Sequence, residues 1–322
     1  MQNKMVREDR RKMLLLIVVA LSLIAAFLLI GLNPKSYGYA LSRRIPKVYA
    51  IVLVGGAIGF SSLIFQTVTN NHILTPSILG LDSLYMLANT VMIFVLGSTS
   101  KWITNAKMHF GLNLILMLIA SAIFYKVIFK NKNGNIFFML LVGVIVGTLF
   151  ESFTTFLQVL IDPSEFLKIQ DKSQASFNQI NTEVLGMATV LIVGGFLYSF
   201  KILGVLDVMA LGRDQAINLG VNYESTVGKM LIVVVILTAA ATALVGPITF
   251  LGILIVNIAR YFIKSYRHKH LALAIWLFSI IFLVGGQLIA ERVLNFGVSV
   301  GIIINFVGGI YFIYLLMKGR AK

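Results

Sequence analysis

The stretch KMLIVVVILTAAATALVGPITFLGILIVNIARYFI, residues 229–263, decides how this chain is organised. One continuous helix of that length would extend about 52 Å, far more than the roughly 30 Å hydrocarbon core of a bilayer. Gly246 and Pro247 interrupt the run near its middle, and proline breaks helices because it lacks an amide hydrogen. Lys229 opens the run and Arg260 lies near its end. The stretch therefore predicts two short membrane crossings joined by a break at Gly246 and Pro247.

The composition of the whole chain is typical of a membrane protein. Of its 322 residues, 58% are hydrophobic and 12% are charged, and the mean hydropathy is +0.93, whereas a soluble domain carries roughly 25% charged residues. The apolar runs do not alternate with polar residues, so we expect helices and an all-α fold. Because residues 14–31 are long enough to span and lack a small-residue cleavage site, we expect a retained first helix rather than a signal peptide. Apolar length predicts about ten spans in one transmembrane domain over residues 1–322, at 14–31, 48–66, 76–97, 109–129, 136–161, 184–203, 229–245, 249–263, 271–290 and 298–317.

The net charge of +15 has a simple explanation in a membrane protein. If the N-terminus is cytoplasmic, the cytoplasmic segments hold about two thirds of the 27 basic residues, as the positive-inside rule requires. We therefore expect an N-in, C-in chain with an even number of spans, and no nucleic-acid partner. The outer segments still hold four basic residues beside the ends of spans: Arg43, Arg44, Lys47 and Arg292. They could serve a function there, or they could simply extend their charged ends to the membrane interface.

The sequence shows little that could support catalysis or metal binding. It has no cysteine, and no acidic residue lies near its four histidines in the sequence. Paired aspartate motifs, a His-Glu-x-x-His motif and a P-loop are all missing, which argues against a membrane enzyme or an ATPase. We expect neither a metal site nor a cofactor. A few polar residues within or beside the spans could line a translocation path or simply pack between helices: Gln66, Glu151 and Asn257.

A polar segment, LDVMALGRDQAINLGVNYES at residues 206–225, separates two apolar runs on the cytoplasmic side. Its apolar and polar positions fit a short amphipathic helix, and Gly220 follows it as a helix stop. Such a helix could lie on the membrane surface or insert its apolar face into the groove of a partner protein. The residues themselves leave both alternatives open.

Five ordered stretches resemble the FecCD-type permeases, the membrane subunits of binding-protein-dependent ABC importers for iron–siderophore, haem and cobalamin. They extend over nearly the whole chain: RRIPKVYAIVLVGGAIGFSSLIFQTVTNN (43–71), LTPSILGLDS (74–83), ALGRDQAINLGVN (210–222), GPITFLGILIVNIAR (246–260) and FGVSVGIIINFVGGIYFIYLL (296–316). The chain departs from the common pattern at Val256-Asn257, where the family commonly has Pro-His, at Lys47, where Arg is commoner, and at Asp82, where a small polar residue is usual. Two stretches, ITFLG…VNIAR (248–260) and DPSEF…ASFNQINTE (162–183), are similar to a subclass that imports catecholate-type ferric siderophores and usually pairs two different permeases.

The resemblance implies a cobalamin-importer-like permease fold and a role without chemistry of its own. The segment 206–225 would be the cytoplasmic coupling segment and would fit a cleft in a separate ABC ATPase dimer. Its coupling residues would be Leu211, Gly212, Arg213, Asp214, Ala216, Leu219, Gly220 and Val221. Arg43, Arg44, Lys47 and Arg292 would meet acidic side chains of an extracellular or periplasmic siderophore-binding lipoprotein.

The resemblance also implies a location and further partners. The expected partners are the lipid bilayer of the bacterial cell membrane, a second permease chain that is different but related, and a ferric siderophore as cargo. Import of haem or cobalamin is the alternative within the family. A secondary transporter or channel working alone, and a membrane enzyme, are the alternatives outside it.

Overall fold

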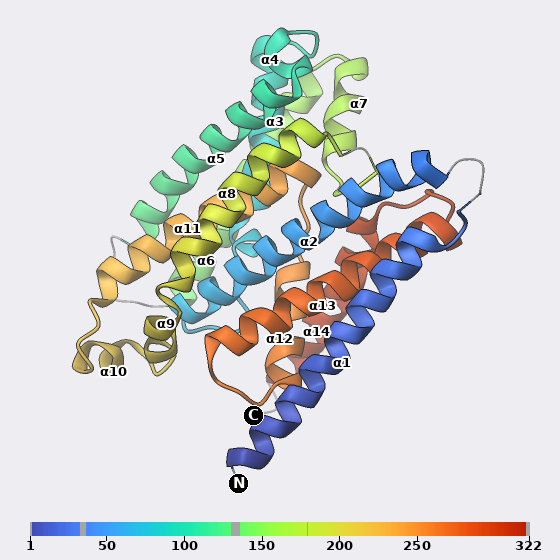
Figure 1. The fold of residues 1–322 in the computed structure, drawn as a ribbon. Coiled ribbons are helices and arrows are strands. Elements are labelled where there is room, and N and C mark those ends of the chain that lie inside the picture. Colours follow the sequence, from blue (N-terminus) through green and yellow to red (C-terminus); the bar gives the residue numbers. More distant parts are fainter. Residues whose placement is uncertain (1, 33–36, 130–135, 179, 320–322) are drawn as a thin grey trace.

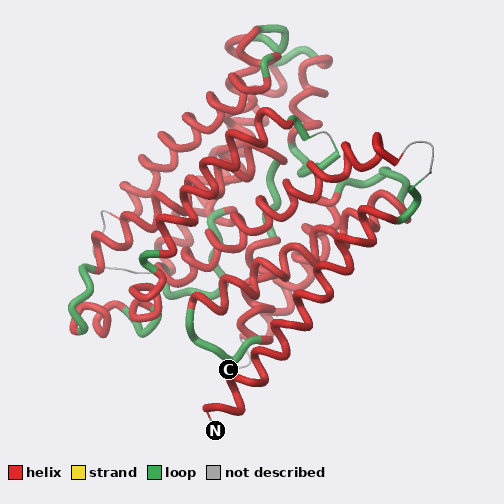
Figure 2. The backbone as a smooth tube through the Cα atoms, viewed as in Figure 1, coloured by secondary structure: helices red, strands yellow, loops and turns green. Residues whose placement is uncertain are grey.

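A computed structural model describes residues 2–32, 37–129, 136–178 and 180–319 (Figures 1 and 2). The described residues form helices joined by loops, without strands. Lys130, Lys132, Arg320 and Lys322, which contribute to the charge argument, lie outside the described residues. The elements are α1 (Gln2–Leu29), α2 (Tyr37–Val68), η1 (Ser77–Leu81), α3 (Asp82–Leu96), α4 (Lys101–Thr104), α5 (Ala106–Phe129), α6 (Ile136–Leu160), α7 (Pro163–Lys172), α8 (Thr182–Phe200), α9 (Leu203–Met209), α10 (Arg213–Asn218), α11 (Tyr223–Val245), α12 (Leu251–Phe262), α13 (His268–Leu288), η2 (Ile289–Val293) and α14 (Val300–Gly319).

The expected number of spans is confirmed. Within the described residues, eight helices are long and apolar enough to cross a membrane, and the shorter apolar helices α3 and α12 complete the set of about ten. The N-terminus, the described C-terminal end, α9 and α10 lie at one end of the bundle, and α4 and α7 lie at the other (Figure 1). We call the first the cytoplasmic end, from the distribution of basic residues, and the second the outer end.

The centre of the bundle is formed by α2, with α11, α12 and α13 packed around it. In the most apolar stretch of α2, 83% of the residues are buried inside the bundle. In that of α14 only 22% are buried, which leaves most of this helix to lipid or a partner. Small residues permit this close packing. A Cβ atom at Gly59 would lie 2.5 Å from Ile275 Cγ2, so α2 and α13 approach at a distance that only glycine allows.

The break within residues 229–263 is a buried turn. α11 ends at Val245, and Gly246 follows with a φ of 95°, in the left-handed region that favours glycine. A neighbouring segment holds this turn, because Ser176 N donates to Val245 O at 2.9 Å and a Cβ at Gly246 would lie 3.1 Å from Ala175 Cα. The chain then returns as α12, which has only 12 residues.

Two elements differ from the expectations. Residues 42–47, SRRIPK, expected outside the membrane just before the second span at 48–66, lie inside α2, which begins at Tyr37 and contains Pro46. The third span, expected to be continuous over 76–97, is interrupted at Gly80, whose φ is 93°. Gly80 must lack a side chain, because a Cβ there would lie 2.8 Å from Gly147 Cα of α6. Close contact between these two backbones is the physical reason for the interruption.

Candidate functional site

The cytoplasmic segment 206–225 folds as two short helices, α9 and α10, instead of one. Gly212 separates them with a φ of 105°, and Gly220 follows α10 with a φ of 85°. Ala216 N donates to Gly212 O at 3.0 Å, and Val221 N donates to Ala216 O at 3.0 Å. These hydrogen bonds make the segment a compact, ordered projection at the cytoplasmic end (Figure 1).

The projection presents an apolar face away from its own subunit. Leu211 is 60% exposed, Leu219 63% and Ile217 45%. Ala216, in contrast, is fully buried against the subunit, and Val221 is half-buried. Exposed leucines beyond the membrane-spanning helices are suited to the groove of a partner. Sequence reasoning missed Ile217, although an aliphatic residue within a polar segment was a usable signal.

The polar residues of the projection lie in solvent. Arg213 and Asp214 are exposed, and Arg213 Nη2 lies 3.6 Å from Glu224 Oε1. Such an exposed ion pair contributes little to stability, since water screens both charges. Both side chains are therefore accessible to a partner.

A hydrogen-bonded chain links this projection to the helices behind it. Asp207 Oδ1, on α9, accepts from His268 N at 2.7 Å and lies 2.6 Å from His268 Nδ1. On the other side of the ring, His268 Nε2 lies 2.8 Å from Thr67 Oγ1, near the cytoplasmic end of α2. Three elements, α9, α13 and α2, thus meet at one buried histidine. Sequence reasoning missed this arrangement because the residues lie far apart in the chain.

At the outer end, two of the basic candidates bind the carboxyl end of α1. Arg44 Nη1 donates to Leu28 O at 2.8 Å and to Ile30 O at 2.9 Å, and Arg292 Nη2 donates to Ile30 O at 2.8 Å. Cations are favourable there because the last carbonyls of a helix have no partner within it and carry partial negative charge. Both arginines therefore have a structural role, although Arg292 is also exposed.

The third basic candidate forms a partly buried ion pair. Lys47 Nζ lies 2.8 Å from Glu291 Oε1, and the two side chains are 13% and 8% exposed. Gln287 Nε2 donates to the same carboxylate oxygen and to Asn178 Oδ1, each at 2.8 Å. Arg43, by contrast, is exposed and has its guanidinium 5.7 Å from the centre of the Tyr39 ring. The structure thus brings the four basic candidates to one end but engages three of them within the subunit.

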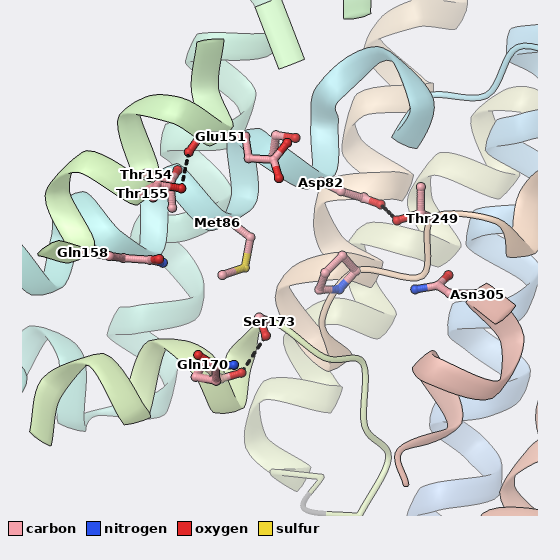
Figure 3. A pocket seen from close by; sticks show the side chains of 12 residues that line it. Asp82, Met86, Glu151, Thr154, Thr155, Gln158, Gln170, Ser173, Thr249 and Asn305 are labelled. Atoms are coloured by element: carbon pink, nitrogen blue, oxygen red, sulfur yellow. Dashed lines mark hydrogen bonds between the residues drawn. The ribbon is translucent and has the colours of Figure 1, made fainter. Parts of the chain in front are cut away.

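A cavity of about 390 Å³ lies in the outer half of the bundle (Figure 3). Glu151 of α6 lines it together with Asp82, whose Oδ2 accepts from Thr249 Oγ1 at 2.6 Å. Asn305 lies on the same side of the cavity as Asp82 and Thr249 (Figure 3), and its Oδ1 accepts from Phe250 N at 3.3 Å. The outer surface helix α7 contributes Gln170 and Ser173. The lining contains two carboxyl groups and no basic side chain among the described residues.

A larger cavity of about 1030 Å³ lies toward the cytoplasmic end and contains the other two path candidates. Asn257 Nδ2 donates to His72 O at 3.0 Å and to Ile253 O at 2.9 Å, so its amide ties α12 to the loop after α2. Gln66 is fully buried, and neither atom of its amide has a hydrogen-bond partner in the described part of the chain. The structure thus divides the predicted path residues between two cavities.

Comparisons with known proteins agree with this architecture. The sequence profile of the FecCD transport family matches residues 12–318. The petrobactin import system permease protein YclO of Bacillus subtilis is 50% identical over 309 residues, which cover 96% of this chain and 98% of that protein. The petrobactin import system permease protein FatC of Bacillus anthracis is 31% identical, covering 98% of this chain and 91% of its own. An inward-facing metal-chelate type ABC transporter has a similar fold, with a TM-score of 0.82, 19% identity, and coverage of 96% of this chain and 99% of its own.

Proposed function

The chain belongs to the FecCD transport family, and we propose that it is the membrane-spanning permease subunit of a binding-protein-dependent ABC importer for a ferric siderophore of the catecholate type. In this proposal, residues 1–322 form one permease domain in the bacterial cell membrane. The observation that carries the proposal is the ordered α9–α10 projection with Leu211 and Leu219 exposed at the cytoplasmic end.

The permease would move cargo without any chemistry of its own. A separate ABC ATPase dimer would bind the α9–α10 projection and close on ATP, and the closure would tilt the helices in a rigid-body change. Exposed apolar side chains would provide the contact area, and Arg213 and Asp214 would fix the register through charge. Of the expected coupling residues, Ala216 would act indirectly, because it is buried under the projection.

The outer end would receive a siderophore-binding protein. Arg43 and Arg292 are exposed there and would meet acidic side chains, which steer docking more than they add affinity. Arg44 and Lys47 would position this surface through their contacts with α1 and Glu291. The exposed apolar faces of peripheral helices such as α14 would contact lipid and a second, related permease chain.

The cargo follows from the relatives. YclO and FatC are both named for import of petrobactin, a catecholate-type siderophore. Their coverage of nearly the whole chain supports the same class of cargo here. Haem and cobalamin, the alternatives within the family, have no comparable support.

Radioiron uptake in an iron-starved deletion strain tests the cargo. We expect cells that carry the gene to accumulate iron from a ferric catecholate siderophore, and cells without it to lose this uptake. Haem and cobalamin in excess should not compete. Equal iron uptake with and without the gene would contradict the proposal, and competition by haem or cobalamin would assign the permease to that cargo.

A further inference from the structure

The cytoplasmic cavity contains an arginine without a counter-charge. Arg260 of α12 lines the cavity and is half-buried, and no carboxylate within the described residues forms an ion pair with it. Its Nε atom is buried and makes no hydrogen bond there. A buried charge without a partner is costly, because it loses its hydration and gains no compensating interaction.

A second, independent observation at the same cavity is the amide of Gln66. Its side chain is fully buried, and both Oε1 and Nε2 lack hydrogen-bond partners among the residues that the structure describes. Buried polar groups are almost always paired, so an orphaned amide lining a cavity of about 1030 Å³ indicates a polar ligand or ordered water. An amide N–H and a guanidinium that line the same cavity are suited to anionic oxygen atoms.

The remaining charged groups around the cavity do not remove the excess positive charge. His268 is bound by Asp207, and Lys264 Nζ lies 3.2 Å from Glu8 Oε2, so these two have acidic partners. His72 also lines the cavity and has no carboxylate beside it in the described structure. Arg260 therefore remains a cation without an acidic partner in the described part of the chain.

From these observations we infer that the cytoplasmic cavity is an anion-binding site for the oxygen-rich, negatively charged head of the iron chelate, occupied before release into the cytoplasm. The inference rests on the proposed function for the identity of its ligand. A ferric tris-catecholate is anionic, because its deprotonated catechol oxygens together outweigh the charge of ferric iron. The bidentate geometry of a guanidinium matches paired oxygen atoms of this kind.

The contrast between the two cavities supports a direction of movement. Two acidic side chains, Asp82 and Glu151, line the outer cavity without a basic side chain among the described residues, so that cavity offers an anion no cationic partner, whereas Arg260 favours an anion in the cytoplasmic cavity. An anionic cargo forced into the outer cavity by a docked binding protein would therefore move toward the cytoplasmic end. A site of this kind must bind weakly enough to release its ligand.

Direct binding to the intact transporter tests the site. The complete complex would be placed in nanodiscs of neutral phosphatidylcholine, without nucleotide or binding protein, and titrated with radioiron-labelled ferric tris-catecholate. We expect saturable binding that weakens with salt. Arg260→Gln should weaken it by roughly ten- to a hundredfold, as the loss of a charged hydrogen bond does. Gln66→Leu, a second variant that keeps Arg260, should also weaken it.

Matched controls and competing anions make the result decisive. Arg267→Gln removes an exposed arginine outside the lining of this cavity and should bind as the wild type does. Binding unaffected by both Arg260→Gln and Gln66→Leu would overturn the inference, as would absence of binding. Full displacement by millimolar inorganic phosphate, or by nanodiscs containing phosphatidylglycerol, would instead assign the site to phosphate or a lipid headgroup. Normal cellular uptake together with no binding would refute this inference alone, whereas loss of the gene without effect on uptake would refute the proposed function.

Discussion

At the scale of single residues, packing of the central helices depends on glycines that face neighbouring side chains. Gly252 of α12 faces α2, where an added Cβ would collide with Ser62 Oγ and lie 2.9 Å from Ser62 Cβ. At Gly285 of α13, in contrast, an added Cβ would have no neighbouring atom within 4 Å. The sequence showed that α2 contains small residues, but it could not show which glycines face a neighbour, because helix rotation is not encoded in local periodicity when all faces are apolar.

We predict that Gly252→Ala destabilises the folded protein by about 1–3 kcal/mol, because the added methyl group must push α2 and α12 apart. Gly285→Ala, the matched control, should leave thermal stability in detergent unchanged or slightly raised. Equal melting temperatures for the two variants would contradict this account of the α2–α12 contact.

The ion pair of Lys47 with Glu291 provides a second prediction at this scale. Lys47→Met would leave a carboxylate that is only 8% exposed without its cation, and we expect a loss of about 3–5 kcal/mol. Lys107→Met breaks a pair with Glu183 whose side chains are 51% and 64% exposed, and it should cost less than about 1 kcal/mol. Thermal unfolding of both variants measures the difference, and similar losses would show that burial of the Lys47 pair has no energetic importance.

At the scale of elements, the long apolar helices could be predicted from the sequence, whereas the short elements could not. Span length follows from bilayer thickness, so each predicted span corresponds to a helical segment, although α1 and α2 begin well before their predicted spans and the third span is interrupted at Gly80. The interruption at Gly80 and the division of 206–225 into α9 and α10 depend on positive φ angles, and glycine permits these angles without requiring them. The contacts of Asp207 with His268 and of Lys47 with Glu291 join distant segments, which one sequence cannot reveal.

The outer helix α7 leads to a prediction about pH. Lys172 contacts His109, its Nζ lying 3.0 Å from Nε2, and burial lowers the pKa of Lys172 to about 8 from 10.5, although the nearby Asp171 raises it. Below pH 8 the amine is protonated in both the folded and unfolded states. Between about pH 8 and 10.5 only the unfolded chain keeps the proton, so stability should rise with pH across this window.

Melting temperatures measured from pH 7.5 to 10 in detergent test this expectation. Lys172→Met should remove the rise, whereas Lys168→Met, at an exposed lysine of the same helix, should retain it. A rise that persists unchanged in Lys172→Met would show that another group is responsible.

The α9–α10 projection gives the second prediction at this scale. Leu211→Asp combined with Leu219→Asp places charge on the exposed apolar face without disturbing buried Ala216. We expect the variant to reach the membrane but to retain less than a tenth of the ATPase during affinity purification, because charge would be buried without a partner. Leu167→Asp, an equally exposed leucine on α7 at the outer end, should retain the ATPase fully.

At the scale of the whole molecule, the arrangement fits a device that transmits motion between two faces. The projection lies at one end, the basic candidates lie at the other, and the two cavities lie between them. Composition alone predicted an all-helical membrane protein. The different roles of the two ends could be predicted only with the family resemblance, because charge bias and amphipathic segments are also found in transporters that work alone.

Transport by the purified complex in proteoliposomes tests the central claim most directly. Iron entry and ATP hydrolysis would be measured together, with the binding protein and ferric catecholate siderophore on the outer side and ATP on the ATPase side. We predict accumulation only with both ATP and binding protein present, and loss of accumulation in the Leu211→Asp, Leu219→Asp variant. Accumulation driven by an ion gradient without ATP, or undiminished in that variant, would contradict the account and indicate a carrier that works alone.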